Sequence, residues 1–322
     1  MRILALDSSG LVASVAVVEK IEEEEQVIAE YTVNYKKTHS QTLLPMLDTV
    51  SDMIELDLKT IDAIAVAGGP GSFTGLRIGS ATAKGLGLAM NKPLIHIPTL
   101  EGLAYNLCGT DAIVCPIMDA RRGQVYTGIY EFCGNELVVL EDQMAISIEE
   151  LGDHLKKYDK RIIFLGDGVP VFRARLTNEI LAEEIKAGRD IQFAPANMNR
   201  QRAASVGTLG LRYYAAGKTE TAMEHEPDYL RLSQAERERK EREAAEAAYD
   251  AEVDTAREEE RIGADEVPGF KALMRKDPEN TRTLLAARKP KRRIMQTLAS
   301  ATGAEGKTDK DYLAEREAEV RA

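Results

Sequence analysis

The chain has 322 residues, of which 44% are hydrophobic, enough for two ordinary domains with buried cores. Its net charge of −11 argues against a protein that holds nucleic acid through an overall positive field. The three cysteines lack the spacing of a metal site or disulfide framework, and no apolar run has the length of a signal peptide or membrane span, so we expect a cytoplasmic protein without membrane association.

Apolar runs in the first hundred residues predict an α/β lobe. Residues 2–7, 12–19 and 27–35 have the composition of three consecutive strands joined by hairpins. In residues 39–56, apolar side chains recur on one helical face behind Ser40, which is a plausible N-cap. A strand at 61–68, a helix at 75–90, a strand at 92–98 and a helix at 99–107 follow.

The same order of elements then begins again. Residues 112–132 contain an apolar strand, an aspartate, a turn with glycine and an alternating strand. Aligning Asp7 with Asp119 brings Gly10 within one residue of Gly123. A strand at 161–169 and a helix at 199–217, closed by Gly217 at its C′ position, complete this part. The echo predicts a duplicated α/β architecture with two lobes.

The last ninety residues have a different composition. From Arg231 onward the chain has 20 Lys and Arg against 21 Asp and Glu, whereas positions 1–230 carry a charge of −10. Residues 233–266 are strong helix formers with almost no apolar stripe, a pattern typical of a solvated helix. Two short helices are expected around 270–274 and 293–301. We therefore expect lobes at 1–108 and 109–232 and a charged, helical or disordered tail at 233–322.

The stretch "GGPGSFTGLRIGSATAKGLGLAM", residues 68–90, begins as a glycine-rich turn. It matches neither the P-loop pattern, which needs a lysine and a hydroxyl after the last glycine, nor the dinucleotide pattern, in which the third glycine comes one residue earlier. Backbone amides at the start of the following helix leave an anion site open, with Ser72 as a weak cofactor-binding candidate.

The helix after this turn carries small residues in rows. Gly75, Gly79, Ala83 and Gly87 recur every four residues and share one face, and Ala81, Gly85 and Ala89 form a second row beside it. Because glycine inside a helix costs about 1 kcal/mol relative to alanine, the rows indicate close approach by another element. Packing within the chain accounts for some of these residues, and we favour an interface for the rest.

Five segments together resemble the TsaB (YeaZ) family: "ILALDSSG", "THSQTLLPML", "GGPGSFTGLRIGSATAKGLGLA", "MDARRGQVY" and "PDYLR". The resemblance covers roughly residues 1–243. It implies the duplicated α/β fold of the sugar-kinase, Hsp70 and actin superfamily. It also implies a part in making N6-threonylcarbamoyladenosine at position 37 of tRNAs that read codons beginning with adenine. Members are non-catalytic scaffold and activator partners of the catalytic paralogue TsaD, joined by the ATPase TsaE, and they meet tRNA through that complex.

The family pairs with its paralogue through two helices of the first lobe, which correspond here to residues 40–56 and 75–90. The resemblance therefore places the partner interface on the small-residue helix and its neighbour. The expected interface residues are Leu43, Leu47, Val50, Gly75, Arg77, Gly79, Ala83 and Gly87.

The residues also argue against catalysis. The catalytic paralogue holds its metal partly through an H-x-x-x-H pair, but here His39 is followed four residues later by Leu43. We expect no metal site, no catalytic residues and a core position for His96. A metalloprotease-like hydrolase would need the missing second histidine. The main alternative is an independent ATP-dependent phosphotransferase of the same superfamily, which rests on Asp7, Asp119 and the glycine loop.

Cofactors and further contacts are open from the sequence. We expect no cofactor of the chain's own, while ATP or ADP with Mg²⁺ at the interface with its partners stays an alternative. Self-pairing as a homodimer in the absence of the partner is also open. Arg121 and Arg122 either solvate their turn or contact partner or tRNA phosphate. The basic cluster Arg288–Arg293 is a second candidate for RNA contact.

Overall fold

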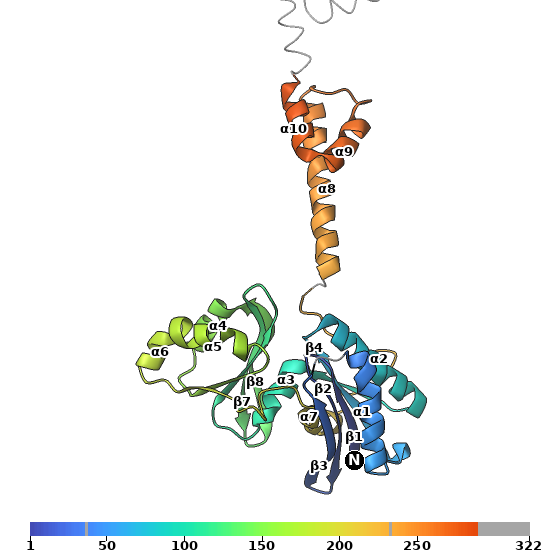
Figure 1. Cartoon of the computed structure of the whole chain (residues 1–322), viewed down its shortest axis with the longest axis vertical. Coiled ribbons are helices and arrows are strands. Elements are labelled where there is room, and N and C mark those ends of the chain that lie inside the picture. The colour runs from blue at the N-terminus through green and yellow to red at the C-terminus, as the bar shows by residue number, and fades with distance from the viewer. Residues whose placement is uncertain (36–37, 232–233, 289–322) are drawn as a thin grey trace, which may run out of the picture. The chain divides into compact units, whose positions relative to one another are not determined.

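The computed structural model describes residues 1–35, 38–231 and 234–288, and it divides into two compact units (Figure 1). Unit 1 comprises Met1–Arg231 and unit 2 comprises Leu232–Ala322. This division lies one residue from the boundary expected from the change in composition. The two units are described separately.

The first lobe of unit 1 is built on a five-stranded mixed sheet of order β3-β2-β1-β4-β5 (Figure 1). β1, β2 and β3 are antiparallel, and β4 and β5 run parallel to β1. Helices α1 and α2 pack on one face and α7 on the other. The bounds are β1 Arg2–Asp7, β2 Ala13–Ile21, β3 Glu24–Val33, α1 His39–Met53, β4 Ala63–Gly69, α2 Phe73–Met90, β5 Leu94–Pro98 and α7 Ala203–Ala215, with a 3₁₀ turn at Leu58–Thr60.

The second lobe repeats this topology. Its sheet has the order β8-β7-β6-β9-β10, with three antiparallel strands followed by two parallel ones. This match, strand for strand, confirms a duplicated α/β architecture with two lobes. The bounds are α3 Thr99–Ala104, β6 Ile113–Asp119, β7 Gln124–Cys133, β8 Glu136–Ser147, α4 Ile148–Leu155, β9 Ile162–Leu165, α5 Val169–Arg175, α6 Ala182–Lys186 and β10 Ile191–Phe193, with a 3₁₀ turn at Tyr105–Leu107 and a π-helical turn at Leu176–Ile180.

Strand β1 shows why both faces of the first sheet are covered. Ile3 and Ala5 point into the cluster beneath α7, and Leu4 and Leu6 point into the cluster beneath α1 and α2. Side chains alternate between faces along a strand, so a continuous apolar run such as "ILAL" requires a helical layer on each side. The core of the lobe therefore consists of two layers separated by the sheet.

The two lobes exchange helices, and this corrects the lobe boundaries expected from the sequence. Helix α7 follows the second lobe in the chain but covers the sheet of the first, where Gly207 and Gly210 let it approach Val18 and Ala65 closely. Helix α3 precedes the second lobe but packs its Leu100 against that lobe's sheet. Sequence order could not reveal this exchange because an apolar helix face is compatible with either sheet.

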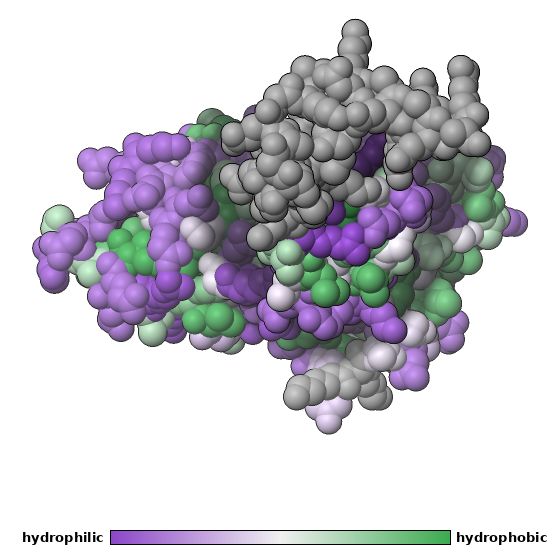
Figure 2. All heavy atoms as spheres, turned by 90° about the horizontal axis from the view of Figure 1, so that it is seen from above, coloured by the Kyte–Doolittle hydropathy of each residue, from purple (hydrophilic) through white to green (hydrophobic). Residues whose placement is uncertain are grey.

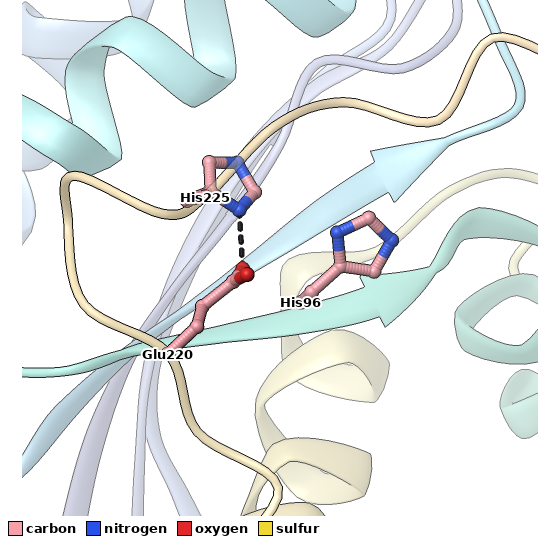
Figure 3. A group of neighbouring side chains, drawn as sticks. All are labelled: His96, Glu220 and His225. Carbon is pink, nitrogen blue, oxygen red and sulfur yellow. Dashed lines mark hydrogen bonds and ion pairs between the residues drawn. The ribbon is translucent and has the colours of Figure 1, made fainter.

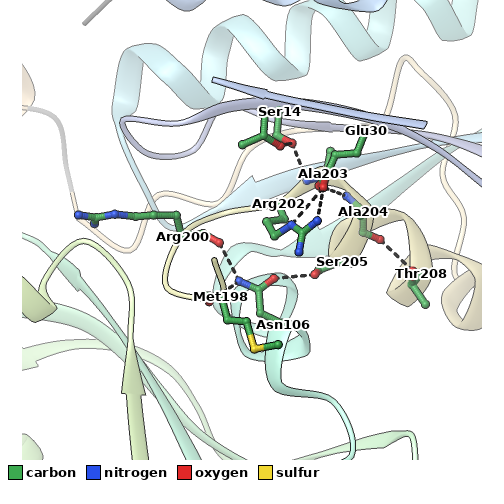
Figure 4. A network of polar contacts seen from close by, with 11 residues as sticks. Ser14, Glu30, Asn106, Met198, Arg200, Arg202, Ala203, Ala204, Ser205 and Thr208 are labelled. Atoms are coloured by element: carbon green, nitrogen blue, oxygen red, sulfur yellow. Dashed lines mark hydrogen bonds and ion pairs between the residues drawn. The ribbon is translucent and has the colours of Figure 1, made fainter. Parts of the chain in front are cut away.

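Polar contacts fix the start of α7 (Figure 4). The Ala203 N–H donates to Ser14 Oγ at 2.9 Å, and the Ala204 N–H donates to Glu30 Oε1 at 3.0 Å. The Arg202 guanidinium also bonds Glu30. First-turn amides have no partner within their own helix, so β2 and β3 supply what a capping side chain would otherwise provide. These contacts join α7 to the first lobe.

Unit 2 is a small helical cluster made of α8 Gln234–Glu258, α9 Val267–Lys276 and α10 Pro278–Ala287. It has a core of its own. The sequence predicted a solvated helix with almost no apolar stripe, and this prediction is wrong for the second half of α8, where Val253 and Ala256 are buried in that core. That core consists of Val253, Ala256, Ile262, Phe270, Met274 and Leu285. The helix expected at 293–301 and all but the first residue of the Arg288–Arg293 cluster lie outside the described residues. None of the helices in the described ranges is long and apolar enough to cross a membrane.

Candidate functional site

The glycine-rich loop between β4 and α2 packs against the chain itself. The Ser72 side chain caps α2 by accepting a hydrogen bond from the Gly75 N–H at 3.3 Å, and the Ser72 N–H donates to the Ser9 carbonyl at 2.7 Å. A Cβ on Gly71 would stand 2.3 Å from that same carbonyl oxygen. The loop glycines therefore give the turn after β1 room to lie against it, and Ser72 acts as a helix cap.

The first small-residue row of α2 faces the same turn. A Cβ on Gly75 would stand 2.1 Å from the Ser8 carbonyl oxygen, and one on Gly79 would stand 2.5 Å from Ser8 Oγ. Ala83 and Gly87, further along the same row of α2, are buried as well. The close approach predicted by the row is real, but the neighbour of Gly75 and Gly79 is this chain's own turn after β1.

The structure thus corrects the expected interface residues. The α1 residues Leu43, Leu47 and Val50 are buried in the core cluster beneath α1 and α2. Leu43, for example, is only 1% exposed. Helix α1 also begins at His39 behind Thr38, so Ser40 is not its N-cap. An amphipathic helix shows the same periodicity whether its apolar face meets a partner or its own sheet. Of the eight residues, Arg77 alone is exposed.

A different set of residues on these helices faces solvent. Gly85 has nothing within 4 Å of its Cβ position, and Ala81 and Ala89, one turn to either side, are exposed as well. Leu88 beside them is 60% exposed. The second small-residue row is therefore the one that another molecule could approach. Helix α1, which contacts α2, adds two exposed apolar side chains, Leu44 and Met53, which lie on opposite sides of α1. We call this set the α1–α2 surface: Leu44, Met53, Ala81, Gly85, Leu88 and Ala89.

Exposed apolar side chains of this kind stand out against a polar background. On the face shown in Figure 2, hydrophilic residues predominate and apolar ones gather in separate groups. Met53 is 80% and Leu44 is 55% exposed, although each is a residue type that folding normally covers. Grouped exposed apolar residues mark interaction sites more often than single ones do.

The start of α2 is joined to the last segment of unit 1. The Arg77 guanidinium lies 3.9 Å from the centroid of the Phe73 ring, which in turn lies 4.9 Å from the ring of Tyr229. Arg77 Nε donates to the Tyr229 hydroxyl at 3.3 Å. This three-residue stack was missed from the sequence, because 152 positions separate Arg77 from Tyr229.

Asp7 lies at the end of β1, buried by its own turn. Its Oδ1 accepts hydrogen bonds from the Ser9 N–H at 2.9 Å and the Ser9 hydroxyl at 2.7 Å. Burial raises the pKa of Asp7 to about 6, although the Ser9 hydrogen bonds and nearby His39 oppose this shift. His39 itself is placed by a 2.8 Å contact between its Nε2 and the Gly10 carbonyl. A carboxyl turned inward in this way is poorly placed to hold a phosphate-bound metal.

Asp119 occupies the equivalent position at the end of β6. It pairs with Arg121, whose N–H donates to Oδ1 at 2.8 Å and whose Nη1 lies 3.1 Å from Oδ2. The Asp119 N–H donates to Asp167 Oδ1 at 3.1 Å, and burial raises the pKa of Asp167. The turn Gly166-Asp167-Gly168, which follows β9, therefore braces this hairpin. Nucleotide binding at Asp7 and Asp119 stays a prediction.

Among the residues that the structure describes, one group of side chains is close enough together to hold a metal ion. His96 on β5 meets Glu220 and His225, with one ligand atom from each within 4.8 Å of the others. His96 is half-buried and contacts titratable groups, so it differs from the core residue expected from its apolar strand. No motif spacing links these three positions, which is why sequence reasoning found no metal site.

The chain was compared with known proteins. A family model described as TsaD, tRNA N6-adenosine threonylcarbamoyltransferase, matches residues 26–239. The tRNA threonylcarbamoyladenosine biosynthesis protein TsaB of Bacillus subtilis is 33% identical over 236 residues, which cover 73% of this chain and 96% of that protein. The TsaB of Escherichia coli is 28% identical, covering 72% and 95%. The solved structure of YeaZ from Pseudomonas aeruginosa superposes with a TM-score of 0.59 at 25% identity, covering 71% of this chain and 99% of that one.

Proposed function

The chain belongs to the TsaB family, and on that premise we propose that it is a scaffold and activator subunit in tRNA threonylcarbamoyladenosine biosynthesis. Participation in that biosynthesis follows from the names of relatives that match over nearly their whole length. The observation that carries the scaffold role is the exposed second row of small residues on α2. The first row packs within the chain, so it is the second row that another protein could approach.

In this proposal, the α1–α2 surface binds the catalytic paralogue TsaD. Gly85 is central because the lack of a side chain lets a partner helix approach the α2 backbone. Leu88, three positions further along α2, supplies exposed apolar area beside that approach. The ATPase TsaE joins the pair, and tRNA is reached through the assembled complex in the cytoplasm. The resemblance to the family supports these partners.

The proposal assigns no catalytic step to this chain. Leu43 takes the place of the second histidine of the paralogue's metal pair, and its side chain is buried in the core. His39, in the first position, bonds the Gly10 carbonyl. His39 and Leu43 therefore do not form a metal-binding pair. We expect no cofactor that takes part in catalysis on this chain and keep ATP with Mg²⁺ for the contacts between subunits.

Reconstitution tests this function. The purified chain would be mixed with TsaD and TsaE of the same cell, and threonylcarbamoyl transfer to tRNA would be measured with and without it. We expect transfer to depend on the chain and to fall at least tenfold with Gly85→Arg. The matched control is Gly269→Arg, which also places the charge at an open helical glycine, but in α9 of unit 2. Equal transfer without the chain would contradict the proposal.

The phosphotransferase alternative is supported less well. It needs an Asp7 carboxylate that can reach Mg²⁺, whereas Asp7 is buried and its Oδ1 accepts two hydrogen bonds from Ser9. Magnesium-dependent ATP turnover by the isolated chain, lost with Asp7→Ala, would favour this alternative over the scaffold role.

A further inference from the structure

The segment after α7 returns to the first lobe and is held there by its main chain. Glu220 and Leu94 exchange two backbone hydrogen bonds, of 3.0 and 2.8 Å, so the segment pairs briefly with the edge strand β5. Eight residues later the Asp228 N–H donates to the Gly68 carbonyl at 2.7 Å. These two anchors bracket a loop whose side chains are brought over His96, two residues beyond Leu94 on β5.

Three side chains converge at this loop (Figure 3). His225 Nδ1 lies 2.6 Å from Glu220 Oε1, and the His96 ring stands beside them with one nitrogen facing the carboxylate. The three ligand atoms lie within 4.8 Å of one another. A Cβ on Gly68 would stand 2.2 Å from the His96 ring, so this glycine makes room for the ring on β4. The position of His96 thus depends on the neighbouring strand β4 as well as on its own strand.

A carboxylate orients His96 from its far side. Asp228 Oδ2 lies 3.1 Å from His96 Nε2, which leaves Nδ1 as the nitrogen available to the cluster. Histidines that bind metals commonly have a carboxylate beside their other ring nitrogen, which favours one tautomer and directs the free lone pair. Asp228 stands at that position, although its 3.1 Å contact with Nε2 does not have the geometry of a hydrogen bond.

His225 is placed to act as a ligand by its geometry. Its side chain is fully buried, and its Nδ1 points at the Glu220 carboxylate. The Lys84 ammonium, which donates to the His225 carbonyl at 2.8 Å, opposes a cation, but Glu220 and Asp228 bring two negative charges.

We propose that His96, Glu220 and His225 bind one divalent transition-metal ion of the zinc class, with Asp228 as a positioning residue. Two imidazoles and one carboxylate form a donor set that suits Zn²⁺, while Mg²⁺ and Ca²⁺ prefer oxygen ligands alone. Ligand atoms around tetrahedral zinc are about 3.3 Å apart, so His96 and Glu220, both partly exposed, close in on the ion. The ion fastens residues 220–228 to β5 and takes no part in threonylcarbamoyl transfer.

Titration of the isolated full-length chain tests this site. After treatment with a chelator, the protein would be titrated with ZnCl₂ and with MgCl₂ by calorimetry. We expect one Zn²⁺ per chain, a higher midpoint of thermal unfolding with zinc, and no heat with Mg²⁺. Co²⁺ would give the visible absorption of a tetrahedral site. Absence of stoichiometric zinc, or equal affinity for Mg²⁺, would overturn the proposal.

Variants separate the site from adventitious binding. His96→Gln and Glu220→Gln should each weaken zinc binding at least 100-fold, and Asp228→Asn about tenfold, because it removes only the outer contact. The matched control is His154→Gln, which breaks a similar pair with Glu141 in the second lobe and should leave the affinity unchanged. Unchanged affinity in His96→Gln would assign the cluster to ordinary hydrogen bonding. No partner protein enters the experiment, so its result is independent of the proposed function.

Discussion

Gly79 of α2 lies directly on Ser8, so close that a Cβ on the glycine would stand 2.5 Å from the serine Oγ. Substitution with Leu would force the helix away from the turn after β1. We expect Gly79→Leu to lower the free energy of unfolding of unit 1 by about 3 kcal/mol or more, as overpacking of a filled core does. Urea unfolding followed by circular dichroism measures it. An unchanged midpoint would mean that the row is not packed within the chain.

The exposed glycine of the same helix should behave in the opposite way. Gly85→Ala should stabilise unit 1 by about 0.5–1 kcal/mol, because alanine favours the helix and meets no atom there. Gly85→Leu should keep the fold but prevent pairing with TsaD by filling the approach to α2. Size-exclusion chromatography of the mixed proteins would measure pairing, with Gly85→Ala as the control. Full pairing by Gly85→Leu would remove the α1–α2 surface from the proposal.

Asp7 should make stability depend on pH. Its pKa is about 6 in the folded chain against an ordinary value of 3.8, so the folded chain binds the proton more strongly than the unfolded chain does. The contribution of the protonated form is complete below pH 4 and is lost as the pH rises to 6 and above, which amounts to at most about 3 kcal/mol. Asp7→Asn keeps an oxygen for Ser9 and carries no charge.

We therefore expect Asp7→Asn to be more stable than the parent chain at pH 7.5 and to lose that advantage at pH 4. Urea midpoints of both proteins at the two pH values provide the measurement. A variant that is less stable than the parent at pH 7.5 would show that the Asp7 charge is stabilised in the folded chain, as the phosphotransferase alternative requires.

Tyr229 should hold the last segment of unit 1 on α2. Tyr229→Ala removes both the ring contact with Phe73 and the hydrogen bond from Arg77, whereas Tyr229→Phe removes the hydrogen bond alone. An aromatic pair is worth about 0.5–1.5 kcal/mol, so the local opening of residues 226–231 should increase severalfold in Tyr229→Ala. Amide hydrogen exchange would follow it. Equal exchange in the alanine and phenylalanine variants would exclude a role for the ring.

The sequence predicted elements better than it predicted their neighbours. Apolar runs fixed β1 and β6, and the Asp7–Asp119 echo revealed the duplication, because both are local patterns. The interface residues were misplaced because the spacing of Gly75 and Gly79 shows that something approaches closely, not what it is. The meeting of His96 with His225 depends on a chain reversal more than a hundred positions later, which no local pattern records.

The exchange of helices between the lobes has a consequence for biosynthesis of the chain. On the ribosome, the first sheet is complete once β5 has emerged, yet one of its faces stays bare until α7 follows, about a hundred residues later. During that interval α7 does not yet cover the side chains of Ile3, Ala5 and Val18 on that face of the sheet. A lobe covered on one side only presents an apolar sheet, which is prone to aggregation. The lobe that carries the α1–α2 surface is thus begun first and finished last.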